Sequence, residues 1–74
     1  MEVETYAIAR DDGLSARQVV ILKFLAQGRD IGDIAHELGY AVSTIKKEVH
    51  LAIRHCGARN RAHAVAVAIR AGLI

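Results

Sequence analysis

The sequence predicts an all-α domain of four short helices, in which the second and third form a helix-turn-helix. Apolar residues recur at helical spacing in four segments, glycines separate these segments, and no proline interrupts them. With 74 residues, of which 53% are hydrophobic, the chain has the size and composition of one small domain. It contains no apolar run long enough to span a bilayer and no visible secretory signal, so we expect a cytoplasmic protein.

The N-terminal segment has the least regular pattern. Alternation in Glu2-Val3-Glu4-Thr5 suggests a strand, whereas Ala7-Ile8-Ala9-Arg10 could equally extend a helix. We therefore expect residues 1–13 to form an irregular or partly ordered arm and residues 14–74 to form the domain.

The first two expected helices have clear start and stop signals. Ser15 is a typical N-cap, and Gly28 suits the left-handed position that ends the first helix. Apolar residues in the segment 19–26 nearly encircle this helix, so we expect it to be buried on most sides. Asp30 can cap the second helix and Gly39 can end it.

The third expected helix has two opposite faces at about 100° per residue. Its apolar stripe consists of Ile45, Val49, Ala52, Ile53 and Cys56. Its polar face consists of Ser43, Lys46, Lys47, His50 and Arg54. From Lys46 onward, six basic residues accompany a single acidic one, Glu48, which is the charge distribution expected for phosphate contact. A short helix, a glycine turn and a basic second helix together suggest a helix-turn-helix that enters a DNA groove.

The fourth expected helix starts after Asn60, covers residues 61–71 and ends at Gly72. It carries more apolar surface than one small core needs, and its alanines would allow another backbone to approach closely. Because a chain this short buries only about 60% of its unfolded surface, a second subunit would add stability. We expect a homodimer; internal packing of the whole helix is the alternative. The expected dimer seam is Ala64, Val65, Ala68 and Ile69.

Several motifs in unbroken order make the chain resemble the LuxR-type, or GerE-type, DNA-binding domain over about residues 14–74. These motifs are Leu14-Ser15-Ala16-Arg17, Ile21-Leu22, Leu25-Ala26-x-Gly28, Ile34-Ala35-x-x-Leu38-Gly39, Ser43-Thr44-Ile45-Lys46, Gly57-x-x-Asn60-Arg61 and Ala64-Val65. The resemblance implies a four-helix domain of the winged-helix-like superfamily with a C-terminal dimerisation helix. It also implies binding as a dimer to inverted half-sites in bacterial promoters, with the third helix in the major groove of double-stranded DNA.

The resemblance also assigns roles to individual residues. It implies base-facing positions for Lys46, Lys47 and His50. Lysines can donate to guanine O6 and N7, and a neutral histidine can either donate or accept. We expect phosphate contacts from Ser43, Thr44, Arg54 and Arg61.

Other classes of function have less support in the sequence. The four histidines and single cysteine include no Cys-x-x-Cys and no histidine pair at i, i+4, so we expect no metal or other cofactor. No nucleophile, base and orienting group occur together on recognisable elements, so we expect neither an enzyme nor a small-molecule site. Cys56 lies on an apolar stripe, where cysteine behaves as a small buried hydrophobe.

Two functions remain. The first is a transcriptional regulator that recruits or blocks RNA polymerase at a promoter. The second is a helix-turn-helix protein-interaction module that modulates another regulator with little or no DNA binding. Three features motivate this alternative: Glu48 in place of a common histidine, Gly32 in place of a commonly basic residue, and the apolar first helix. Ala41, in place of a serine cap, also suggests weaker or altered DNA contact. We expect the carboxylate of Glu48 to be repelled if it approached phosphate.

Overall fold

A computed structural model describes residues 13–74, which form four helices and no strand within that range. The helices are α2 (Ala16–Ala26), α3 (Ile31–Leu38), α4 (Val42–His55) and α5 (Arg61–Arg70). The all-α prediction is therefore confirmed, whereas the expected irregular arm lies outside the described residues except for Gly13. No helix in the described range has the length and apolar character needed to cross a membrane.

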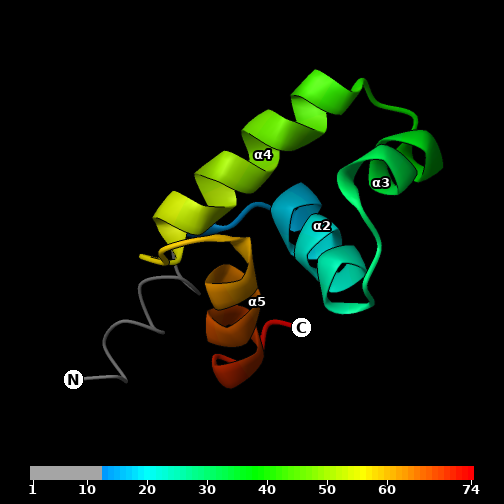
Figure 1. Cartoon of the computed structure of the whole chain (residues 1–74). Coiled ribbons are helices and arrows are strands. Elements are labelled where there is room, and N and C mark those ends of the chain that lie inside the picture. Colours follow the sequence, from blue (N-terminus) through cyan, green and yellow to red (C-terminus); the bar gives the residue numbers. More distant parts are fainter. Residues whose placement is uncertain (1–12) are drawn as a thin grey trace.

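The longest helix, α4, lies across the other three (Figure 1). Its N-terminal half is next to α3, its C-terminal end is next to α5, and α2 lies between them. Since α2 packs against all three other helices, it holds the two ends of the domain together. One side of α4 therefore remains uncovered by the other described helices.

Side-chain caps fix where three of the helices begin. Ser15 Oγ accepts the N–H of Gln18 at 3.1 Å, and Gln18 Oε1 accepts the N–H of Ser15 at 3.1 Å, which completes a capping box at α2. Asp30 and Asn60 cap α3 and α5 by accepting backbone N–H groups at 2.8 and 2.9 Å. All three predicted N-caps are confirmed.

The turn between α3 and α4 depends on a glycine. Gly39 ends α3 with φ of 76°, a left-handed conformation that costs other L-residues free energy. The N–H groups of Gly39 and Tyr40 both donate to the carbonyl oxygen of Ala35, at 2.9 and 3.0 Å. These bonds fix the direction in which the chain enters α4.

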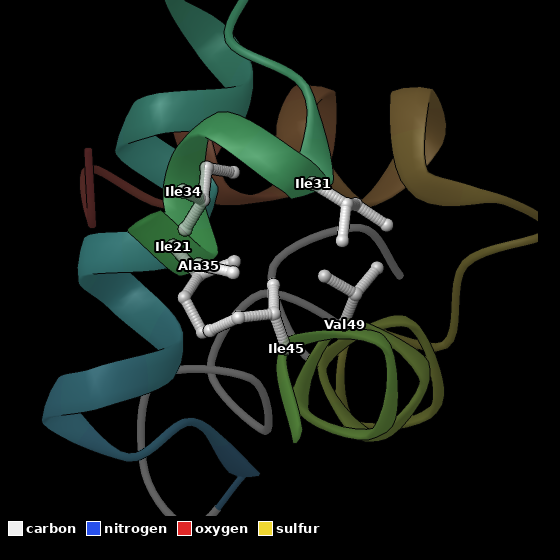
Figure 2. Close-up of a cluster of buried hydrophobic side chains, with 6 residues drawn as sticks. All are labelled: Ile21, Ile31, Ile34, Ala35, Ile45 and Val49. Atoms are coloured by element: carbon white, nitrogen blue, oxygen red, sulfur yellow. The ribbon is translucent and has the colours of Figure 1, made fainter. Parts of the chain in front are cut away.

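A first core cluster joins α2, α3 and α4 (Figure 2). Its buried members are Ile21, Ile31, Ile34, Ala35, Ile45 and Val49. In Figure 2 the side chain of Ile45 extends from α4 toward those of Ile21 and Ala35, and Val49 points toward Ile31. Because these contacts come from one face of α4, they determine which face remains outside.

A second core cluster attaches α5 to α2 and the C-terminal half of α4. Its buried members are Leu22, Ala52, Cys56, Ala64, Val67 and Ala68. Cys56 is 1% exposed, and this burial raises the pKa of its thiol. The expectation of a buried cysteine is confirmed.

Helix α2 is less buried than its apolar sequence suggests. Only Gln18, Ile21 and Leu22 are buried along it, while Val20 is 39% exposed. The prediction that α2 is enclosed on most sides is therefore wrong. The domain is small, and three neighbouring helices cover one face and part of the flanks but leave the opposite side open.

Candidate nucleic-acid interface

The open side of α4 carries the polar face expected from the sequence. Ser43, Lys46, Lys47, His50 and Arg54 are exposed on it. The opposite side of the same helix is buried in the first and second core clusters. Within residues 13–74, no hydrogen bond or ion pair engages the four basic side chains of this face. Their donors are therefore available to a ligand.

The N-terminus of α4 also offers donors. Ala41 occupies the N-cap position and supplies no side-chain hydrogen bond, and no bond from Ser43 replaces the cap in the described residues. The first N–H groups of a helix have no intrahelical acceptor, so here they can bind water or an anion. Thr44, half-buried in the first turn, lies next to these groups.

One flank of α4 borders a hollow of about 230 Å³. Lys46 and His50 line it from α4, and Arg61, the first residue of α5, lines it from the other side. Arg61 of α5 thus lies beside the same face of α4 as Lys46 and His50, although it is more than ten residues away in the sequence. The packing of α5 against α4 brings Arg61 there.

The other flank of α4 is tied to α2 by Glu48. Its Oε2 accepts a hydrogen bond from Arg17 Nη1 at 3.1 Å, and its Oε1 accepts one from Gln18 Nε2 at 2.9 Å. The guanidinium carbon of Arg17 also lies 4.6 Å from the ring centroid of Tyr40, in the turn before α4. We call these four residues, Arg17, Gln18, Tyr40 and Glu48, the α2–α4 polar cluster.

This cluster shows which groups the carboxylate of Glu48 contacts. Its side chain is only 17% exposed, and both carboxylate oxygens are occupied by donors from α2. Its charge therefore faces a cation of the same domain and is not directed as a free carboxylate toward a phosphate. The polar cluster was not predicted, because its partners lie 30 and 31 residues apart and no local pattern joins them.

The residues expected at a dimer seam differ in exposure. Ala64 and Ala68 are fully buried in the core of their own subunit. Val65 is partly exposed and Ile69 is 54% exposed. Of the four expected seam residues, Val65 and Ile69, which lie one turn apart, are the two with surface available to a second subunit.

Two further hollows lie between α5 and α2. One, of about 460 Å³, is lined by Leu25, Ala26 and Val65 among others, and the second, of about 440 Å³, is lined by Ala26 and Ile69 among others. Charged or polar side chains also line both hollows, among them Arg29 in the first and Lys23 in the second. Within residues 13–74, no group of three or more histidine, cysteine, aspartate or glutamate side chains is placed to hold a metal ion.

Comparison with known proteins gives a consistent result. The family described as bacterial regulatory proteins, luxR family, matches residues 12–68. A protein of Bacillus subtilis (strain 168), named "Uncharacterized transcriptional regulatory protein YxjL", is 34% identical over 71 residues. The match covers 96% of this chain and 33% of that protein, so the chain spans about a third of the length of this relative. No solved structure matches the chain at a significant level.

Proposed function

Since the chain belongs to the LuxR family of bacterial regulatory proteins, we propose that it binds promoter DNA sequence-specifically through α4 and thereby regulates transcription. The observation that carries this proposal is the exposed face of α4, whose basic side chains have no partner within residues 13–74. A helix with one face in the core and an unpaired basic face outside is suited to enter a major groove.

We propose that three of these side chains read bases. Lys46 and Lys47 are exposed near the N-terminal end of α4, and His50 is exposed one turn beyond Lys46. Lysine recognises guanine through its O6 and N7 acceptors, and the histidine can pair with a donor or an acceptor. Each good base contact contributes about 1–3 kcal/mol of discrimination against a wrong base.

We propose that other groups bind the DNA backbone. Ser43, Thr44 and the free N–H groups at the start of α4 can donate to one phosphate, and Arg54 can reach another further along. Arg61 contributes a cation from α5 at the edge of the same face. Because each neutralised phosphate releases counterions, binding must weaken steeply as salt is added.

We also propose that the domain binds inverted repeats as a homodimer through α5. Val65 and Ile69 supply exposed apolar surface there, and each lines a hollow that α2 also borders. Val65→Glu should shift the sedimentation of a dimer toward the monomer, because it buries a charge in the seam. Val20→Glu, which places the same charge on an exposed apolar residue of α2, is the matched control and should leave the dimer intact. A dimer that survives Val65→Glu would place the interface elsewhere.

Selection from a randomised duplex library at low salt tests the proposed function. Enrichment of an inverted repeat would support it. Absence of retained DNA at every salt concentration would overturn it and favour the second candidate, a module that binds another regulator. The structure removes one argument for that candidate, because Glu48 is occupied by Arg17 and Gln18.

A further inference from the structure

We propose that Arg17, on α2, is an additional contact to the DNA backbone, held in place for that purpose by Glu48 and Tyr40. The inference rests on the proposed DNA binding of α4 and adds to it a residue from a different helix. It is carried by the geometry of the α2–α4 polar cluster.

The guanidinium of Arg17 is fixed from two directions. Nη1 donates to Glu48 Oε2 at 3.1 Å, and the guanidinium carbon lies 4.6 Å from the centre of the Tyr40 ring. One of these partners belongs to α4 itself and the other to the turn that leads into it. A long side chain restrained in this way has less rotamer freedom to lose when it binds a ligand.

The restrained guanidinium still has donors to offer. It carries five N–H groups, of which the bond to Glu48 engages Nη1, and the side chain is 44% exposed. Glu48 is much more shielded, at 17%, and its second oxygen is occupied by Gln18. The carboxylate is therefore directed inward and the guanidinium outward. An outward-facing planar fork of donors is well suited to phosphate oxygens.

The position of Arg17 fits the same DNA face. Glu48, which binds it, lies one helical turn after Thr44, on the flank of α4 between the polar face and the buried stripe. At about 100° per residue, this flank is roughly 160° around the helix from Lys46 and His50, which border the hollow with Arg61. Arg17 and Arg61 therefore flank α4 on opposite sides. In a major groove about 12 Å wide, they would face the phosphates of the two different strands.

Binding measured as a function of salt tests the proposal. Fluorescence anisotropy on the duplex selected by the wild-type protein should be recorded from about 50 to 200 mM salt. For Arg17→Gln, the slope of log K against log salt should fall by about 0.9 per bound subunit, and the affinity at about 0.1 M salt should fall about eightfold per subunit. Arg17→Lys should retain most of the slope because it keeps the charge. Lys23→Gln, which removes an exposed cation elsewhere on α2, should leave slope and affinity unchanged.

The outcomes separate this inference from the proposed function. If wild-type protein binds and Arg17→Gln has the wild-type slope, Arg17 only links α2 to α4 and the inference is wrong. If Lys23→Gln lowers the slope as much as Arg17→Gln does, the effect of both substitutions is one of net charge, and the inference is also wrong. If wild-type protein binds no duplex, both proposals fail. Partial unfolding of a variant shifts log K at all salt concentrations but leaves the slope as a readout of phosphate contact.

Discussion

Replacing Glu48 by alanine should destabilise the domain by about 1–3 kcal/mol, because it removes the acceptor of a buried donor. Gln18 is 5% exposed, and its Nε2 donates to Glu48 at 2.9 Å. A buried donor that loses its acceptor costs the desolvation of that group. The lost ion pair with Arg17, whose side chain is 44% exposed, adds at most about 1 kcal/mol because solvent screens it.

The expected loss is a large part of the total stability. A chain of 74 residues is stabilised by about 4–11 kcal/mol at typical values per residue. With a denaturant dependence of about 1 kcal/mol per molar urea, the unfolding midpoint should fall by about 1–3 M. Circular dichroism at 222 nm during urea titration measures it directly.

A matched control isolates the buried contact. Glu37 also pairs with an arginine, Arg29, but its side chain is 54% exposed and the bond joins two surface groups. Glu37→Ala should therefore cost no more than about 1 kcal/mol. A double-mutant cycle between Gln18→Ala and Glu48→Ala should show coupling of at least about 0.5 kcal/mol. Equal losses for the two glutamates, or additivity in the cycle, would refute the reasoning.

Three further predictions test the fold. Cys56 should react with a thiol reagent only when the domain unfolds, and rapid labelling of folded protein would contradict this. Burial raises the pKa of the Cys56 thiol in the folded state, so the unfolded thiol loses its proton first and the free energy of unfolding should fall as pH rises above the ordinary thiol pKa. Asn60→Ala should lower the free energy of unfolding by about 0.5–2 kcal/mol through loss of the α5 cap, and no change in urea titration would count against that cap. Gly39→Ala should cost about 1 kcal/mol because φ is 76°, whereas Gly32→Ala within α3 should be neutral or stabilising; the reverse order of urea midpoints would be inconsistent with the turn.

Local signals in the sequence were sufficient for the helices and their ends. Ser15, Asp30 and Asn60 each cap a helix through a backbone group three residues away, and Gly39 adopts the conformation that ends α3. These interactions act over a few residues, so residue type and spacing predict them. The split of α4 into a buried and an exposed face followed from helical periodicity in the same way.

Long-range packing determined what the sequence did not predict. No local pattern predicted a partner for Glu48, but α2 brings Arg17 and Gln18 to it across about 30 residues. Ala64 and Val65 are neighbours in the sequence, yet Ala64 is fully buried and Val65 is partly exposed. Periodicity identifies an apolar helix, but only the positions of α2 and α4 decide which of its residues face the core of their own subunit.

The central claim, that the exposed face of α4 reads DNA, is tested most directly by removing Lys46 and Lys47 together. Both side chains are exposed and without partners in residues 13–74, so the double alanine variant should keep the wild-type circular dichroism spectrum and urea midpoint. Its affinity for the duplex selected by wild-type protein should fall at least about tenfold, as expected for the loss of base contacts worth about 1–3 kcal/mol each. Lys23→Ala should bind like wild type. Unchanged binding of the folded double variant to that duplex would contradict the claim.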